Sequence, residues 1–536
     1  MTTIQRFIKK IESIHTLYIA TFLFVITFIT YANTLPNGLF FDDEDFIYKN
    51  VYVQNFSVSK YFTQNLIAGA SKISNYYRPL LLITYGVEYK LFGDAGFIYH
   101  FDNLLLHAAA GILLFFLLKK LTKNIFISFL TSTLFLIHPV QTEAVSYASG
   151  RSDPLAFVFI LLTMLFYLKG TTKSYVLSLI FFICAFLSRE TAIITPALLL
   201  LIEFFQTRSI AKTLSRIRLL LPIISIAIFY FILRLTVLNF QNTLNFYQGQ
   251  TAYSTHLYYR LLTFLSLLPT YMGFLFFPKT LNLEREATVI TTFANPLVII
   301  SLFTVIVFFI FSLKLQKKHP LFLFSFLWFF VTIAPTSGII PINGILYEHF
   351  LYLPSIAIFL IVSYCLFLVG MHIKSPAIQN VVAGVVIVSV MLLMFRTIQR
   401  NFDWHDPITF YSQIIKLNPR SARVHNNLAM ALSEDGRNTE AVKEYRKAIK
   451  LSDVYPQTHF NLANSYISLN RIDDAEKEYQ NTLRIDPSFV QAYMRLAMLY
   501  KQTHQTKKFD TLLKKAGSLS QKNPNFIQLE QYLKSM

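Results

Sequence analysis

The chain has 536 residues, of which 54% are hydrophobic and only 14% are charged, and its mean hydropathy is +0.47. A soluble globular protein averages about 25% charged residues, so this composition excludes an ordinary soluble domain and requires lipid to cover the apolar surface. The formal net charge is +19, but the sequence contains no zinc-finger spacing and no RNA-binding signature. Positive charge concentrated in short loops is typical of membrane topology and contact with anionic headgroups, rather than of nucleic-acid binding.

The N-terminus is basic and then apolar, with Arg6, Lys9 and Lys10 before a first apolar stretch at 16–33. No small-residue cleavage site follows, which predicts an uncleaved signal anchor. The acidic cluster Asp42-Asp43-Glu44-Asp45 comes soon after this stretch. Its carboxylates repel one another, and each would cost several kcal/mol to bury unpaired. The cluster is either a solvated loop or a functional site, and the rest of the chain favours a site.

Eleven apolar stretches are interpreted as membrane spans, each of about 17–25 residues or shorter where aromatic residues flank it. They lie near residues 16–33, 100–118, 125–138, 154–168, 174–188, 190–205, 218–238, 297–313, 321–335, 353–370 and 377–395. They predict an all-α protein in which residues 1–395 form a polytopic helical bundle of about 11 spans. Residues 396–536 are predicted to form a separate domain.

Loops rich in lysine and arginine alternate with the remaining loops. The basic residues are Lys119, Lys120, Lys123, Lys169, Lys173, Arg208, Lys212, Arg216, Arg218, Lys314, Lys317 and Lys318. The positive-inside rule places these loops and the N-terminus in the cytoplasm. The apolar stretch 257–277 then has both flanks outside, so it is expected to be re-entrant or interfacial. An odd number of spans, eleven, puts the C-terminal domain outside. If 257–277 also spans the membrane, the number becomes even and the C-terminal domain lies in the cytoplasm.

The same assignment gathers ionisable residues on the extracytoplasmic side. They are Asp42, Asp43, Glu143, Arg151, Asp153, Arg189, Glu190, Glu348 and His349. Ionisable residues in membrane regions are functional candidates by default. Their convergence at one face of a bundle is what an active-site cavity at the outer interface needs.

The C-terminal domain repeats with a period of 34 residues. The aligned positions are Leu428, Leu462 and Leu496, each followed by alanine, then Ala441 with Ala475, Tyr445 with Tyr479, and Leu451 with Ile485 and Leu519. This period and pattern indicate about three tetratricopeptide repeats, an α-α solenoid with a concave binding surface. Tyr411 and Leu417 suggest a half-unit before the array. The alternative is a purely structural cap on the membrane body.

Several motifs follow one another in the membrane region. They are Gly38-Leu-Phe-Phe-Asp42-Asp43, Tyr77-Arg78-Pro79-Leu80, Tyr99-His100 leading to Leu106-His107, His138-Pro-Val-Gln-Thr-Glu143, Gly150-Arg151-Ser-Asp153, Arg189-Glu190 and Glu348-His-Phe-Leu-Tyr-Leu-Pro354-Ser355. In this order, with repeats after the last span, the chain resembles the transmembrane-and-tetratricopeptide O-mannosyltransferases and their bacterial relatives. These are C-class multispanning glycosyltransferases that use polyprenyl-phosphate sugars. Eukaryotic members usually carry more repeats, and many relatives have lysine at the position of Arg189.

The resemblance implies transfer of a sugar, with mannose as the family's sugar, from a polyprenyl-phosphate donor to a protein or glycan hydroxyl. An inverting transfer needs a carboxylate that takes the proton of the acceptor hydroxyl, and Asp42 or Asp43 is the candidate base. The phosphate leaving group needs cations, and the candidates are Arg189, Arg151, Arg78 and His349. Supporting roles fall to Glu143, Asp153, Glu190, Glu348 and His138.

Bland alternatives exist for several of these residues. Arg151 could pair with Asp153 or Glu143, Arg189 could pair with Glu190, and His138 could cap a helix. A divalent cation is compatible with Asp42, Asp43, Glu143 and His349 as ligands, although no ligand spacing demands one. No other cofactor is expected.

Two other functions compete with the transferase. One is a membrane-anchored scaffold that works through its repeats, and the other is a lipid or glycan transporter. A scaffold needs one anchor rather than eleven spans, and the chain lacks the paired broken helices of many transporters. The composition favours a bacterial protein of the inner membrane with extracytoplasmic repeats; in a eukaryote the membrane would be that of the endoplasmic reticulum.

Overall fold

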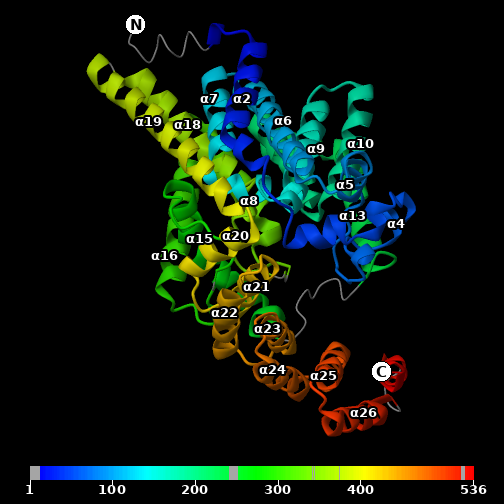
Figure 1. Cartoon of the computed structure of the whole chain (residues 1–536). Helices are drawn as coiled ribbons and strands as arrows, with labels where there is room; N and C mark the ends of the chain where they lie inside the picture. The colour runs from blue at the N-terminus through cyan, green and yellow to red at the C-terminus, as the bar shows by residue number, and fades with distance from the viewer. Residues whose placement is uncertain are drawn as a thin grey trace. The chain divides into compact units, whose positions relative to one another are not determined.

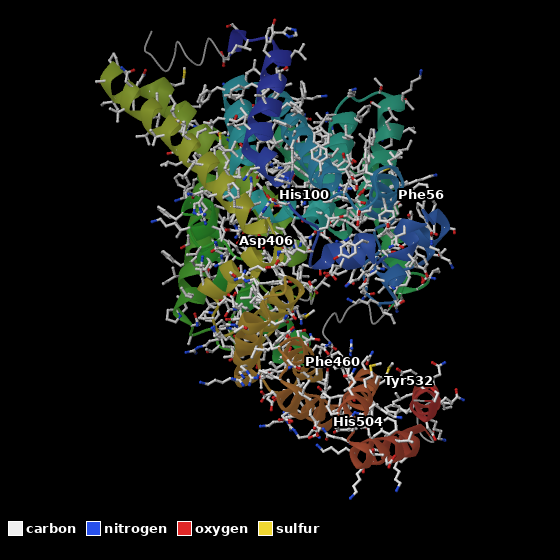
Figure 2. The ribbon with its side chains drawn as sticks, viewed as in Figure 1. Phe56, His100, Asp406, Phe460, His504 and Tyr532 are labelled. Atoms are coloured by element: carbon white, nitrogen blue, oxygen red, sulfur yellow. The ribbon has the colours of Figure 1, made fainter. Side chains whose placement is uncertain are left out.

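The computed structural model describes residues 12–240, 251–285, 287–340, 342, 344–373, 375–520 and 525–535. Within these ranges the chain forms helices and no strand, which confirms the all-α prediction (Figure 1). The basic residues Arg6, Lys9 and Lys10 of the expected signal anchor lie outside the described residues. The chain divides into two compact units, Met1–Asp406 and Pro407–Met536, and Asp406 is labelled in Figure 2.

Each of the eleven predicted spans corresponds to a helix of the first unit. The helices are α2 (Thr16–Tyr31), α6 (Gly96–Thr122), α7 (Ile125–Ile137), α9 (Ser152–Tyr167), α10 (Thr172–Ser188), α11 (Thr195–Thr207), α13 (Leu221–Leu235), α16 (Pro296–Leu315), α17 (Pro320–Ile333), α18 (Ser355–His372) and α19 (Pro376–Asn401). Their starts follow local chemistry. Asn124 and Asn295 accept backbone N–H groups as N-caps, and Pro196 occupies the first turn of α11, where no N–H is needed.

Eight helices of the described chain are long and apolar enough to cross a membrane, and up to ten if each of two bent pairs counts as one span. Helices α10 and α17 are apolar but shorter. The eight include α15 (Leu257–Phe276), the stretch expected to be re-entrant or interfacial.

Contacts along α18 define one end of the bundle. Near the start of α18, the Leu353 carbonyl accepts from Trp328 of α17, and Ser355 accepts from Gln141, which follows α7. Phe126, at the start of α7, lies 6.4 Å from Phe367 near the end of α18. His319, just before α17, contacts the Tyr364 hydroxyl further along α18 at 2.8 Å. Helices α7 and α17 are therefore both antiparallel to α18, and their C-terminal ends lie at the same end of the bundle.

Both ends of helix α15 are hydrogen-bonded to residues at this end of the bundle, where α7 and α17 terminate. Arg260, in its first turn, donates to the carbonyl of Gly338, which follows α17. At its last turn, the carbonyl of Leu275 lies 3.0 Å from Nε2 of His138, which follows α7. This arrangement supports a helix that enters and leaves on one face, as the loop charges suggest, although its length alone would allow a span.

The segment between α2 and α6 folds into a small helical region of its own. It contains η2 (Glu44–Tyr48), α3 (Val51–Gln54), α4 (Val58–Thr63), η3 (Ala68–Ala70) and α5 (Pro79–Phe92). A separate hydrophobic core that includes Ile47, Val53, Leu81 and Tyr85 holds these elements together, and Phe56 of this region is labelled in Figure 2. The acidic cluster therefore sits in a folded region rather than in an extended loop.

The second unit is a row of helix pairs. The helices are α20 (Pro407–Leu417), α21 (Ala422–Glu434), α22 (Asn438–Leu451), α23 (Pro456–Ser468), α24 (Ile472–Ile485), α25 (Val490–Gln502), α26 (Thr506–Ser520) and α27 (Asn525–Ser535). The repeated alanines are completely buried, as in Ala429, Ala463 and Ala497, which allows the paired helices to approach closely. A histidine–glutamate pair also recurs with the repeat: His425 contacts Glu444, and His459 contacts Glu478.

Candidate functional site

Of the three aspartates in the acidic cluster, Asp43 is buried, Asp42 is exposed and Asp45 is partly buried. Asp43 is 1% exposed, and its Oδ1 accepts from the backbone N–H of Ser149 at 2.8 Å and from the Ser149 hydroxyl. Its Oδ2 accepts from the backbone N–H of Phe40 at 3.3 Å. Burial raises the pKa of Asp43 to about 7. Asp42 is exposed, so it is the carboxylate that solvent and substrate can reach.

The backbone of Asp42 is fixed by Tyr147. The Asp42 N–H donates to the Tyr147 hydroxyl at 2.9 Å. The Tyr147 ring stacks on Trp404, with 5.0 Å between centroids and an interplanar angle of 22°. Trp404 belongs to η10 (Phe402–Trp404), directly after the last apolar helix. The backbone carbonyl of the next residue, His405, accepts the N–H of Gly38 at 3.1 Å. The segment 38–45, here called the acidic loop, is thus linked to residues that follow α19, directly at Gly38 and through Tyr147 at Asp42.

Arg151 is completely buried within the bundle. Its guanidinium pairs with Glu88 at 2.6 Å and donates to Asn103, to Thr84 and to the carbonyl of Tyr99. Each of its three guanidinium nitrogens therefore donates to a protein acceptor, and the phosphate contact predicted for Arg151 would have to compete with these bonds. Its partner is Glu88, not the expected Asp153 or Glu143, and the pair anchors the turn that carries Ser149.

Two arginines, Arg78 and Arg189, donate to the same serine hydroxyl at the start of α9. Arg78 pairs with Glu190 at 3.1 Å and donates to Ser152 at 3.2 Å. Arg189 pairs with Asp153 at 2.6 Å and donates to the same Ser152 hydroxyl at 2.8 Å. The Arg189–Glu190 pair, which is the alternative to phosphate binding, does not form; each of the two residues pairs with a residue of another element instead. Within the described chain, Arg189 Nε is buried without a hydrogen-bond partner, and burial lowers the pKa of Arg189.

One turn joins the acidic loop to these cations. Ser149 binds Asp43, Ser152 binds both Arg78 and Arg189, and residues 149–153 are consecutive in the chain. The exposed carboxylate of Asp42 and the paired guanidinium groups consequently belong to one local cluster. An exposed carboxylate can accept a proton, and an arginine N–H without a partner, as at Nε of Arg189, can donate to a phosphate oxygen.

A second charged group lies on neighbouring elements. Glu143 accepts from the backbone N–H of His349 at 3.0 Å and contacts its Nδ1 at 2.6 Å. Glu348 is completely buried and lies 3.5 Å from both Arg285 and Arg400. The predicted residues Glu143, Glu348 and His349 therefore come together, and two arginines that the sequence did not single out complete the group.

Three histidines, His100, His107 and His138, lie buried in the first unit. His138 Nδ1 accepts from the N–H of Val140, as an N-cap does. His107 contacts the Tyr352 hydroxyl at 2.8 Å, and His100 is buried inside the first unit (Figure 2). The described residues hold no group of three or more His, Cys, Asp or Glu side chains arranged for a metal ion.

Sequence reasoning missed Tyr147, Glu88 and Arg400. Tyr147 stands just before the Gly150-Arg151 motif and could have been noticed as an aromatic beside it. Glu88 lies in α5, 63 residues from its partner Arg151, and Arg400 follows an apolar span. No local pattern signals either of these two.

Known proteins are similar to this chain both in its repeats and over most of its length. A family model described as TPR repeat matches residues 431–469, and two described as tetratricopeptide repeat match residues 410–443 and 460–503. Protein O-mannosyl-transferase F38B6.6 of Caenorhabditis elegans is 27% identical over 435 residues, covering 79% of this chain and 61% of that protein. Human protein O-mannosyl-transferase TMTC3 is 25% identical over 455 residues, covering 77% of this chain and 49% of that protein. The chain thus matches about half to three-fifths of the length of these relatives.

Proposed function

Because the chain resembles the transmembrane-and-tetratricopeptide O-mannosyltransferases over most of its length, we propose that it is an integral-membrane glycosyltransferase. It moves a sugar, with mannose the first candidate, from a polyprenyl-phosphate donor to a protein or glycan hydroxyl on the extracytoplasmic side. The observation that carries the proposal is the single turn 149–153, which holds the exposed Asp42 loop next to Arg78 and Arg189.

Asp42 acts as the base in this proposal, and Asp43 positions it. An inverting transfer requires a carboxylate that takes the proton of the attacking hydroxyl while the phosphate departs from the opposite face of the sugar. Asp42 is exposed and its backbone is fixed by Tyr147. Asp43 is buried and its two oxygens accept from Ser149 and Phe40, so it cannot approach a substrate without breaking these bonds.

Arg78 and Arg189 stabilise the phosphate, and His349 is a third candidate. Guanidinium groups bind phosphate oxygens through two parallel N–H donors. The buried Nε–H of Arg189 has no hydrogen-bond partner in the described chain and is therefore available as one of these donors. Glu143 holds Nδ1 of His349, which leaves Nε2 as the ring nitrogen that a phosphate oxygen would meet. No step of this scheme requires a metal ion.

Arg189→Gln is expected to raise the KM for the lipid donor about tenfold or more, because it removes a charged hydrogen bond to phosphate. Arg189→Lys should retain part of the activity, since it keeps the charge and loses the fork. Initial rates at limiting donor and saturating acceptor measure both effects. Lys49→Gln is the matched control, because it removes an exposed cation from the same region and should leave donor KM unchanged. Wild-type rates in both Arg189 variants would show that Arg189 serves only to pair with Asp153.

The repeats are assigned to the acceptor. A tetratricopeptide array offers a concave surface for an extended partner, and the proposed site for the chemistry lies entirely in the first unit. The array therefore holds or orients a polypeptide or glycan and takes no part in bond making. This assignment requires the repeats to be extracytoplasmic. The bonds that join both ends of α15 to residues at one end of the bundle support the eleven-span count behind that placement.

Truncation after Asp406 is expected to separate chemistry from acceptor binding. Trp404 stacks on Tyr147, and the carbonyl of His405 accepts the N–H of Gly38, so the cut must follow both residues, at the boundary between the two units. The shortened protein should still transfer sugar slowly to water or a small hydroxyl acceptor, while transfer to the natural acceptor drops sharply. Donor consumption with each acceptor, in nanodiscs, gives the comparison. Equal activity of both forms on the natural acceptor would refute the acceptor role of the repeats.

A further inference from the structure

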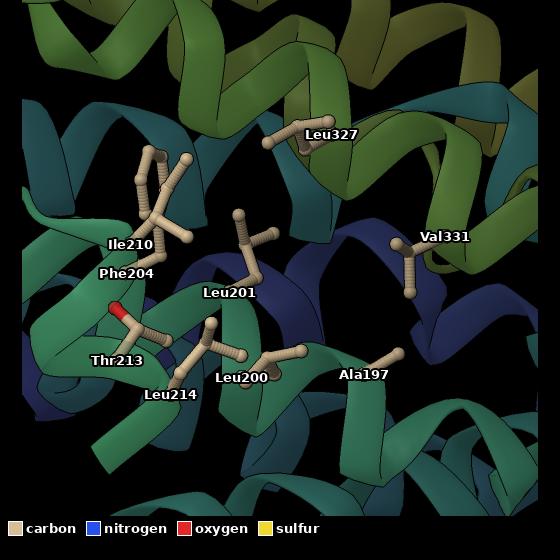
Figure 3. Close-up of a pocket in the computed structure, with 9 residues that line it drawn as sticks. All are labelled: Ala197, Leu200, Leu201, Phe204, Ile210, Thr213, Leu214, Leu327 and Val331. Atoms are coloured by element: carbon tan, nitrogen blue, oxygen red, sulfur yellow. The ribbon is translucent and has the colours of Figure 1, made fainter. Parts of the chain in front are cut away.

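An apolar groove runs along α11, at a distance from the charged site. One cavity of about 320 Å³ lies between α11, α12 (Ile210–Ser215) and α17, and all of its lining residues except Thr213 are apolar (Figure 3). A second cavity of about 430 Å³ shares Leu201, Phe204 and Ile210 with the first. The two cavities are therefore adjacent, and together they are here called the α11–α17 groove; each lies within the size range of ligand pockets.

The groove has one apolar end and one basic end. Ala197 of α11 and Val331 of α17 line its first cavity, whereas Arg208 and Lys317 line the second. From Ala197 to Arg208 the helix rises about 16 Å at 1.5 Å per residue. That length is about half of the roughly 30 Å hydrocarbon core of a bilayer, so the groove spans the depth of one leaflet.

The basic end has charge available for a ligand. Arg208 is exposed and donates to the backbone carbonyl of Lys317 at 3.5 Å, and no ion pair of either side chain occurs within the described chain. Arg216, by contrast, is held by the buried Glu203 at 2.8 Å, which fixes α12 over the groove. Ile210 and Leu214 of α12 are 69% and 55% exposed, so their apolar surface has no protein cover.

We propose that the α11–α17 groove binds one anionic phospholipid of the leaflet that faces the basic loops. One acyl chain lies along the groove towards Ala197, and Arg208 and Lys317 contact the headgroup phosphate. The depth of the groove fits an acyl chain of one leaflet and is too short for a polyprenyl chain. The basic residues of a membrane protein attract the anionic lipids of the cytoplasmic leaflet, which supplies the charge complementarity. This site is independent of the proposed transferase chemistry.

Native mass spectrometry of the full-length protein in detergent tests the proposal, with phosphatidylglycerol, phosphatidylcholine and polyprenyl phosphate added separately. Phosphatidylglycerol should be retained in a one-to-one complex, more strongly than either other lipid. Arg208→Gln with Lys317→Gln should weaken this binding about 30-fold, because each cation near an anionic headgroup contributes about fivefold. The control, Lys169→Gln with Lys173→Gln, removes the same charge from another basic loop and should bind as the wild type does.

Ala197→Phe provides an independent test within the apolar half. Ala197 is exposed in the groove, so a phenyl ring there fills the space for the acyl chain without displacing a core residue. Phosphatidylglycerol should then be lost while the melting temperature of the apo-protein is unchanged. If the control pair Lys169→Gln and Lys173→Gln loses phosphatidylglycerol equally, or if Ala197→Phe retains it, the lipid is bound unspecifically and the proposal is wrong. Preferential binding of polyprenyl phosphate would assign the groove to the donor lipid instead and also overturn the proposal.

Discussion

Asp42→Asn is expected to lower sugar transfer by at least about 10²-fold, the low end of general-base contributions. The substitution keeps the size and hydrogen bonding of the side chain and removes its basicity. Asp42 is the exposed member of the acidic pair, and its backbone is held by Tyr147, so little else should change. The effect should appear in kcat, measured with polyprenyl-phosphate sugar and acceptor both saturating, while donor KM stays near the wild-type value.

Two further variants make the assignment to Asp42 specific. Asp45→Asn removes a carboxylate from the same cluster, one that pairs with Lys72 at 2.6 Å, and should retain nearly full transfer. Asp43→Asn places an amide against the N–H donors of Phe40 or Ser149 and should act through loop geometry and stability. If Asp42→Asn, Asp43→Asn and the double variant all transfer at the wild-type rate, the base mechanism is wrong. The scaffold interpretation predicts that outcome, with partner binding by the repeats unaffected.

Arg151→Met is expected to destabilise the protein by about 3–5 kcal/mol, the usual cost of breaking a buried ion pair from one side. Arg151 is completely buried, and Glu88, its partner at 2.6 Å, is 4% exposed. The variant leaves Glu88 and Asn103 without their donor and loosens the turn that carries Ser149. Thermal unfolding in detergent, followed by the loss of the monodisperse peak in size-exclusion chromatography, measures the change.

Arg189→Gln is the internal comparison for this effect. Arg189 also pairs with a carboxylate, yet its loss should mainly change donor KM, because the group is proposed to bind phosphate. Arg151→Lys should recover only part of the stability, since lysine cannot donate to Glu88, Asn103 and Tyr99 together. A stable Arg151→Met variant with a raised donor KM would contradict the stabilising role of the Arg151–Glu88 pair and would indicate that Arg151 binds the donor phosphate.

The helices could be predicted from the sequence because their signals are local. Each apolar stretch long enough to span became a helix, and the period of 34 residues located the repeats, since Ala429 and Ala463 must be small where paired helices touch. Both patterns depend on residues within one or two turns of each other, and the physical reason for each is contained in the segment itself.

The pairing of charges could not be predicted in the same way. Arg189 and Glu190 are neighbours in sequence, but adjacent residues at the start of a helix point in different directions, so each finds a partner on another element. The choice between Asp42 and Asp43 likewise depends on Ser149, which is 106 residues away. Such contacts are set by how α5, α6 and α9 pack, and no local pattern records them.

The most direct test of the central claim is sugar transfer by the purified full-length protein in nanodiscs. It is given polyprenyl-phosphate mannose and a mixture of extracytoplasmic proteins from cells that lack this gene. We expect hexose on serine or threonine residues, detected by mass spectrometry, with release of an equal amount of polyprenyl phosphate, and neither product with Asp42→Asn. A folded wild-type protein that leaves polyprenyl-phosphate mannose and other polyprenyl-phosphate sugars intact would contradict the account.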